Sequence, residues 1–202
     1  MSIEIEKKAR LSEENYLEVC KLIQEKYGVP GFVEKTDIYY RNLFAANPED
    51  FTIRLRKISN SVWKGNSSGK YELCSKVREA LDDGTEVNKE LETELSVKDT
   101  EAFKSALENA GIGFFYNKIK NGLEWTVPLK FKKHPFSLHV EVFRVTSDNG
   151  YRDFFIEVEY TGDCEVELET NFVIEKINDL LKEFGCTEIE PMKYQDLILA
   201  YS

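Results

Sequence analysis

Alternating polar and apolar residues run through most of the chain and predict antiparallel β-strands. Such alternation places every second side chain on the same face of a strand. It predicts strands at Ile3–Arg10, Thr36–Leu43, Phe51–Ser59, Lys70–Arg78, Val87–Val97, Phe114–Lys120, Leu123–Phe131, Ser137–Val145, Asp153–Tyr160 and Tyr194–Ala200. Turn signals predict tight connections at Asp82-Asp83-Gly84, Asn121-Gly122 and Asp148-Asn149-Gly150. Eight to ten strands with few helices favour an α+β protein whose mostly antiparallel sheet closes into a barrel.

Three segments carry apolar residues at helical spacing and end before a glycine, which is common after a helix. The spacing predicts helices at Ser12–Tyr27, Asp99–Ala110 and Glu167–Phe184, with Ser12 as the N-cap of the first. Amphipathic helices need an apolar surface to cover. We therefore expect these three helices to pack outside the barrel.

Charged residues follow the two-residue period of several predicted strands, and their signs are largely segregated between strands. Acidic residues share a face at Glu4 and Glu6, at Glu90, Glu92 and Glu94, and at Glu157 and Glu159. Basic residues share a face at Arg54 and Arg56 and at Lys118 and Lys120, whereas Lys70, Glu72 and Lys76 mix the signs. The opposite faces are apolar, as at Ile3, Ile53 and Ile156.

Two arrangements explain these faces. In the common one, the charged faces meet solvent and the apolar faces fill the barrel. In the other, the charges line the interior and the apolar faces pack outward against the helices. Like charges on one solvated face repel each other, so the segregation of sign favours a charged interior. The three amphipathic helices favour it as well, because they need apolar strand faces to cover.

Composition narrows the class of protein. The 202 residues, 42% of them hydrophobic, fit a single globular domain over residues 1–202. Acidic residues outnumber basic ones by 37 to 27, for a formal net charge of −10, which is opposite to the balance of a general nucleic-acid binder. No apolar stretch reaches the roughly 18–20 residues of a membrane span, and the charged N-terminus is unlike a secretory signal. The four cysteines are widely spaced, so we expect free thiols in a cytoplasmic protein. We also expect a monomer or homodimer with neither nucleic acid nor membrane as a partner.

An interior that holds acidic and basic faces together suits a complex of a metal ion and a phosphate chain. Clustered carboxylates are hard oxygen ligands that suit Mg²⁺ or Mn²⁺. Arginine and lysine side chains bind phosphate oxygens. Because Mg²⁺ is usually held by a few carboxylates plus substrate phosphates, the pattern predicts a site for a metal–polyphosphate complex.

The order of these motifs resembles the CYTH superfamily, the triphosphate tunnel metalloenzymes, over nearly the whole chain. The run Glu4-Ile5-Glu6-Lys7-Lys8 is similar to the N-terminal E-x-E-x-K signature of that family. Segments that resemble its later motifs are Thr36–Tyr40, Phe51–Arg56, Leu73–Lys76, Lys89–Glu94, Tyr116–Lys120, Phe155–Glu159 and Lys193-Tyr194. The family includes class IV adenylate cyclases, thiamine triphosphatases and inorganic triphosphatases.

The resemblance implies a role for each matching residue. Glu4, Glu6 and Lys8 would be catalytic. The oxygens of a small-molecule triphosphate would bind Lys8, Arg54, Arg56, Lys76, Lys118, Lys120 and Lys193. Mg²⁺ or Mn²⁺ would bind Glu4, Glu6, Glu90, Glu92, Glu141, Glu157 and Glu159.

The chain also departs from the family pattern. Lys120 stands where the family usually has arginine, which removes a planar bidentate donor. Glu141 is assigned where the family usually has aspartate. The central acidic pair can be Glu90 with Glu92, which we prefer, or Glu92 with Glu94. These departures bear on the substrate more than on the fold.

The resemblance is consistent with two enzymatic reactions. The residues by themselves raise two further classes of protein. In a phosphohydrolase, water attacks the phosphate chain. In an adenylate cyclase of class IV type, the ribose 3′-oxygen attacks the α-phosphorus and pyrophosphate leaves. We favour the phosphohydrolase, because water needs no nucleoside pocket. A module that binds polyphosphate or a nucleotide without turnover is an alternative, whereas a lipocalin-like barrel would need an apolar interior.

A zinc site is a weaker hypothesis. His134 and His139 lie near Glu141 in the sequence, and a cluster of histidine and glutamate can bind zinc. Two histidines without a third nitrogen or sulfur ligand argue against such a site.

Overall fold

The computed structural model describes residues 2–42, 52–60, 70–131, 134–162 and 167–201, and side chains at 75–80 and 88–92, among others, lie outside that description. The described residues form eight strands and four helices. The strands are β1 (Ser2–Leu11), β2 (Gly31–Asn42), β3 (Thr52–Asn60), β4 (Lys70–Ala80), β5 (Glu86–Ser96), β6 (Ile112–Phe131), β7 (His134–Thr146) and β8 (Arg152–Gly162). The helices are α1 (Glu13–Tyr27), α2 (Val97–Asn109), α3 (Glu167–Glu183) and α4 (Tyr194–Ala200).

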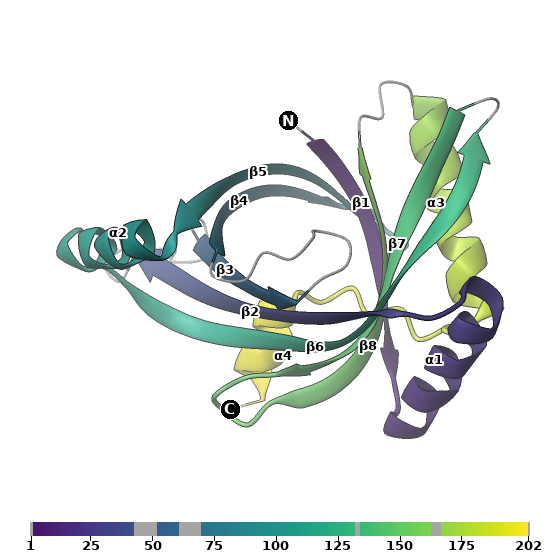
Figure 1. Ribbon diagram of the computed structural model, residues 1–202, viewed down its shortest axis with the longest axis horizontal. Coiled ribbons are helices and arrows are strands. Elements are labelled where there is room, and N and C mark those ends of the chain that lie inside the picture. The colour runs from purple at the N-terminus through teal and green to yellow at the C-terminus, as the bar shows by residue number, and fades with distance from the viewer. Residues whose placement is uncertain (1, 43–51, 61–69, 132–133, 163–166, 202) are drawn as a thin grey trace.

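The strands pair antiparallel in the order β1-β5-β4-β3-β2-β6-β7-β8. Since β1 pairs with both β5 and β8, the order returns to its start and forms a closed barrel (Figure 1). The predicted α+β class with an antiparallel sheet is confirmed.

The register between strands places charged positions beside one another. On one side of the ring, Glu6 lies opposite both Glu86 of β5 and Glu159 of β8. On the other side, Asp37 of β2 lies opposite Arg56 of β3. Since side chains of directly opposite residues point to the same face, one face of the sheet carries charges of both signs.

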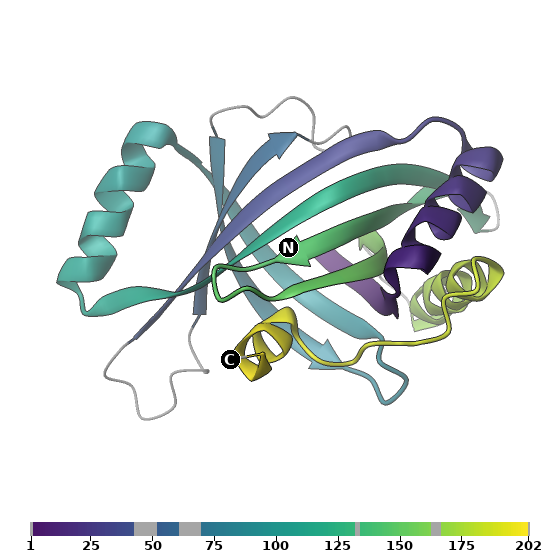
Figure 2. The same ribbon diagram turned by 90° about the horizontal axis from the view of Figure 1, so that it is seen from below.

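The main apolar core lies on the other face of the strands, beneath α1 and α3. Ile5 and Ala9 of β1 are fully buried there, beside apolar residues of β6, β7 and β8. Val19 and Ile23 of α1 and Ile177 of α3 complete this layer. Figures 1 and 2 show α1 and α3 close together against the same part of the sheet. The predicted packing of apolar strand faces against helices is confirmed for this region.

Two of the three predicted helices, α1 and α2, begin at serine caps. The Ser12 hydroxyl accepts a hydrogen bond from the Asn15 amide at 3.1 Å, and α1 ends at Gly28, whose φ is +87°. The second helix, α2, begins two residues before the predicted Asp99, with Ser96 as its cap. Leu107 of α2 packs in a smaller cluster with Leu55 of β3.

The segment Tyr194–Ala200 is a helix, so the prediction of a last strand there was wrong. Its apolar residues at positions 194, 197 and 198 have the i, i+3, i+4 spacing of one helical face. Leu197 and Ile198 pack against Phe143 of β7 and Phe155 of β8, which lie on the charged face of their strands. α4 therefore closes an aromatic cluster at one end of the barrel interior (Figure 2).

Strand β6 runs without a break from Ile112 to Phe131, so the predicted turn at Asn121-Gly122 was wrong. Gly122 pairs with Phe143 of β7. A Cβ atom at Gly122 would lie 2.2 Å from the carbonyl oxygen of Val142 and 2.5 Å from the Cα of Phe143. The glycine thus permits a close approach of two strands.

The other two predicted turns are confirmed. Gly84 follows β4 with a φ of +81°, and Gly150 follows β7 with a φ of +89°, values that favour glycine. No helix within the described parts of the chain is both long enough and apolar enough to cross a membrane.

Candidate active site in the barrel interior

A basic group lies where β2, β3 and β6 adjoin. Asp37 is fully buried and accepts two hydrogen bonds from Arg56, at 2.6 and 3.0 Å. Its Oδ2 also lies 3.1 Å from Nζ of Lys118. Burial by itself would raise the pKa of Asp37, but the charges of Arg56 and Lys118 outweigh it and hold that pKa well below its usual value. Arg54 lies two residues before Arg56 on the same face, opposite Tyr39.

A second group joins lysines of β2 and β6 to glutamates of β7 and β8. Glu141 forms ion pairs with Lys35 and with Lys120, the latter at 3.4 Å. Lys120 also lies 2.6 Å from Oε1 of Glu157. Burial opposes ionisation of Glu141, but Lys35 and Lys120 lower its pKa overall. Glu141 is therefore held in the charged form.

Tyr194 of α4 lies among these charges. Its hydroxyl donates a hydrogen bond of 2.9 Å to Oε2 of Glu157. Nζ of Lys118, Lys8 and Lys120 lies 4.5, 5.2 and 5.4 Å from the centre of its ring, respectively. Burial, and then the charge of Glu157, raise the pKa of Tyr194 well above its usual value, so it remains a neutral donor. α4 thus contributes to the site as well as to the core.

An acidic group lies where β1 meets β8. Glu4, Glu6 and Glu159 each place a carboxylate oxygen within 4.8 Å of the others. Next to them, Lys8 pairs with Glu86 of β5 at 3.3 Å. Three converging carboxylates form a donor set of hard oxygen atoms, which fits Mg²⁺ or Mn²⁺.

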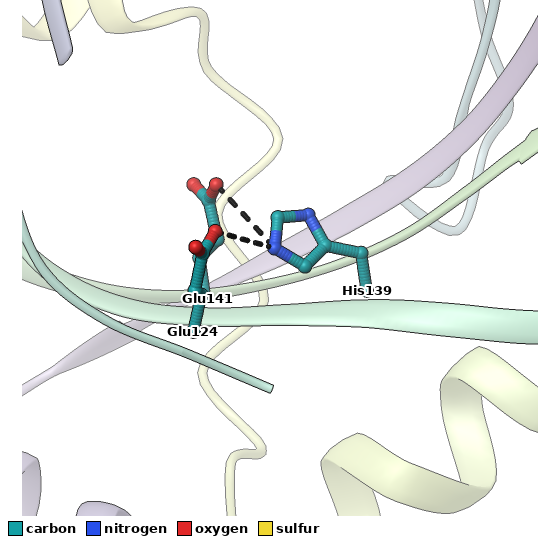
Figure 3. A group of neighbouring side chains, drawn as sticks. All are labelled: Glu124, His139 and Glu141. Carbon is teal, nitrogen blue, oxygen red and sulfur yellow. Dashed lines mark hydrogen bonds and ion pairs between the residues drawn. The ribbon is translucent and has the colours of Figure 1, made fainter. Parts of the chain in front are cut away.

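A buried histidine, His139 of β7, connects the acidic group to the rest of the interior through Glu159. Figure 3 shows its other side, where the ring faces Glu124 and Glu141. Its Nε2 lies 3.1 Å from Glu124 of β6 and 3.8 Å from Glu141, and its Nδ1 lies 2.9 Å from Glu159. Burial disfavours the charged imidazole, but hydrogen bonds to Glu124 and Glu159 outweigh it and raise the pKa of His139 to about 9. In the absence of other ligands, His139 is therefore protonated at neutral pH.

The structure brings most of the residues assigned from the sequence to one face. Ten of them have described side chains in or beside the groups above: Glu4, Glu6, Lys8, Arg54, Arg56, Lys118, Lys120, Glu141, Glu157 and Glu159. Lys193 is exposed at the start of α4, and it is the neighbouring Tyr194 that contacts Glu157.

The remaining three assignments, Lys76, Glu90 and Glu92, have side chains outside the described residues. Their backbone positions are described, and Glu90 lies opposite Lys76 of β4 and Ser2 of β1. The choice between the two registers of the central acidic pair stays a prediction.

Five charged residues in these groups were not assigned from the sequence: Lys35, Asp37, Glu86, Glu124 and His139. Three of them carried a usable signal. Lys35 and Asp37 alternate with Thr36, in the pattern that identified the other charged faces. Glu124 continues the even-numbered face of Lys118 and Lys120, but the turn predicted at Asn121-Gly122 separated it from those two residues.

A scan of protein-family models and a search of curated proteins found no match to the chain. Solved structures do match. A Pyrococcus horikoshii OT3 protein is 20% identical over 98% of this chain and 99% of its own, with a TM-score of 0.70. A candidate adenylyl cyclase from Hippeastrum with a dominant triphosphatase activity is 15% identical over 100% and 97%, with a TM-score of 0.66. A chain of the Schizosaccharomyces pombe Mediator head module is 14% identical over 90% and 96%, with a TM-score of 0.63.

These similarities establish the fold along the whole chain. The matching structures include candidate adenylate cyclases and triphosphatases, which have the tunnel fold that the sequence motifs resemble. They also include a chain of the Mediator head module. Since one fold can serve several functions, the function has to be argued from the charged interior.

Proposed function

We propose that this protein is a metal-dependent enzyme that acts on a linear triphosphate, or on a nucleoside or other organic triphosphate, in the barrel interior. The observation that carries the proposal is the convergence of an acidic and a basic group on one interior face. The acidic group is Glu4, Glu6 and Glu159. The basic group gathers around Asp37 and includes Arg56 and Lys118.

The basic side chains would bind the phosphate oxygens. Lys8, Arg54, Arg56, Lys118 and Lys120 carry five positive charges, more than one phosphate group requires. Arg54 and Arg56 are separated by two residues of a strand, or about 6.6–6.8 Å, which suits contact with different phosphoryl groups of one chain. Asp37 would keep Arg56 and Lys118 in place while the triphosphate binds, because it is fully buried between them.

The acidic side chains would hold Mg²⁺ or Mn²⁺ next to the phosphate chain. When bound, the ion would neutralise the charge that develops on the phosphate oxygens during phosphoryl transfer. Glu4, Glu6 and Glu159 would position it, with Glu157 close by and held by Lys120 and Tyr194. A glutamate of this group would also orient the attacking water in a hydrolase.

Hydrolysis is the reaction we favour, because water needs no nucleoside pocket. The triphosphatase activity of the Hippeastrum protein with the same fold supports this choice. Cyclisation of ATP, with pyrophosphate as the leaving group, is the second candidate. Product identity separates the two, because a hydrolase releases phosphate whereas a cyclase releases pyrophosphate and a cyclic nucleotide.

The test is incubation of the protein with inorganic triphosphate, thiamine triphosphate or ATP, each with Mg²⁺ or Mn²⁺, followed by identification of the products. Glu4→Gln and Glu6→Gln each remove one negative ligand atom and keep the shape of the side chain. We expect each variant to lose at least about tenfold in turnover, because less charge remains to hold the ion. Glu14→Gln, on the exposed surface of α1, is the control and keeps full activity.

Two outcomes contradict the proposal. One is turnover that survives in EDTA or in both glutamate variants. The other is binding of the triphosphates without any product, which identifies a binding module of the same fold.

A further inference from the structure

His139 and two glutamates form a compact cluster that the proposed reaction does not use as a unit. Glu124 lies directly opposite Glu141 across β6 and β7, and His139 lies two residues before Glu141 on the same face. The side chains of all three are at most 3% exposed. Three adjacent positions on a rigid sheet thus direct one nitrogen and two carboxylates to a single point (Figure 3).

The separations between the donor atoms fit shared coordination of one ion. Nε2 of His139 lies 3.1 Å from a Glu124 oxygen and 3.8 Å from a Glu141 oxygen. With metal–ligand bonds of about 2.0–2.1 Å, two ligands of a tetrahedral site lie ~3.3 Å apart. The observed distances lie on either side of that value, so small side-chain movements suffice.

The other imidazole nitrogen has the partner expected for a metal ligand. Histidines that bind a metal usually donate their second N–H to a carboxylate or carbonyl, which fixes the ring orientation. Nδ1 of His139 lies 2.9 Å from Oε1 of Glu159. This contact leaves Nε2 directed toward Glu124 and Glu141.

The charges around the His139 ring favour a bound cation. Glu124, Glu141 and Glu159 contribute three negative charges around the ring, and Lys35 and Lys120, which contact Glu141, contribute two positive ones. A bound dication would take the place of the proton between Nε2 and Glu124. Lys35 contacts Oε1 of Glu141, the oxygen that faces Nε2, so its ammonium group would move off that oxygen when the ion binds, whereas Lys120 would stay on Oε2.

We propose that Glu124, His139 and Glu141 form a second metal site, distinct from Glu4, Glu6 and Glu159, that selects a first-row transition-metal dication over Mg²⁺. The imidazole nitrogen is the reason for the selection, because it suits Zn²⁺, Co²⁺ or Ni²⁺ and Mg²⁺ prefers oxygen. Glu124, which is distant in the sequence, supplies a third ligand; it is an oxygen ligand and takes the place of the further nitrogen or sulfur ligand that the sequence lacked. The proposal does not depend on turnover of a triphosphate.

The test uses metal ions alone, without phosphate. Zn²⁺ is titrated into the protein while the side-chain ¹⁵N signals of its two histidines are followed by NMR. We expect the Nε2 signal of His139 to shift with one equivalent of Zn²⁺ and to stay in place with equimolar Mg²⁺. Calorimetry should show that His139→Gln weakens binding at this site at least tenfold, whereas His134→Gln, which removes the other histidine, leaves it unchanged.

Further variants make the result decisive. Glu4→Gln should leave the His139 shift intact, because that carboxylate belongs to the other group. If His139→Gln does not fold, the shift in the wild type and the loss of Zn²⁺ binding in Glu124→Gln decide the question. Equal Zn²⁺ affinity of folded His139→Gln and the wild type would overturn the proposal. So would an unshifted His139 signal at saturating Zn²⁺, or Co²⁺ spectra that show thiolate ligation by a cysteine.

Discussion

At the scale of single residues, the interior charges stabilise one another. Asp37 lies between Arg56 and Lys118, and Glu141 lies between Lys35 and Lys120. A buried charge without a partner is costly, so each pair is needed for folding as well as for the charge of the site. The same basic side chains can then meet phosphate oxygens with little reorganisation.

Asp37→Asn tests this mutual dependence. The substitution leaves two buried cations facing a neutral amide, so we expect the free energy of unfolding to fall by about 3–5 kcal/mol. Urea unfolding followed by circular dichroism measures the change. Asp148→Asn, in the exposed turn after β7, is the control and should stay within about 0.5 kcal/mol of the wild type. A loss no larger than that of the control would show that Asp37 contributes little.

The same carboxylate predicts a dependence of stability on pH. The pKa of Asp37 lies well below its usual value in the folded protein, whereas it is about 3.9 in an unfolded chain. The unfolded state therefore binds the proton more readily, and the contribution of Asp37 is complete above about pH 4 and is lost as the pH falls further. The stability difference between wild type and Asp37→Asn should be constant from pH 7 to 5 and shrink below pH 4. A difference that instead grows on acidification would contradict this assignment.

At the scale of elements, α4 depends on its packing. It has seven residues, and a helix of that length is marginal in water. Its buried side chains meet the aromatic cluster on β7 and β8, and Tyr194 reaches Glu157. The helix therefore couples one end of the barrel to the charged groups.

Ile198→Ala tests the packing of α4. Ile198 is 1% exposed, so truncation should leave a cavity and cost about 2–5 kcal/mol of unfolding free energy. The matched control is Leu199→Ala, since the adjacent Leu199 is 38% exposed and should cost far less. Chemical denaturation of both variants provides the comparison, and equal losses would mean that α4 does not pack as described.

At the scale of the whole molecule, the sequence correctly predicted the features that depend on local periodicity, above all which side chains share a strand face. The alternation at Glu4-Ile5-Glu6 and Arg54-Leu55-Arg56 identified the charged faces, because strand geometry alone determines which side chains share a face. The prediction from periodicity failed at Tyr194–Ala200, because a short apolar run suits both a strand and a helix. It failed at Gly122, because a glycine that permits close strand contact has the same signature as a turn.

The pairing of strands that are distant in the sequence could not be predicted from the sequence alone. Asp37 meets Arg56 because β2 and β3 pair in a particular register, and Glu86 meets Lys8 because β5 pairs with β1. Neither register follows from periodicity along one strand. The partners of the assigned basic residues therefore emerged only from the folded chain.

The central claim, that the charged interior binds a triphosphate chain, is tested most directly by calorimetric titration at fixed Mg²⁺ and salt. Tripolyphosphate should bind the wild type at one site and at least about tenfold more tightly than orthophosphate. Arg54→Ala should weaken tripolyphosphate binding by about 1.5–3 kcal/mol, the range for a hydrogen bond to a charged group. Lys57→Ala, on the exposed opposite face of β3, should bind as the wild type does. Equal affinity for the two phosphates, or an Arg54 variant that binds like the Lys57 variant, would contradict the account.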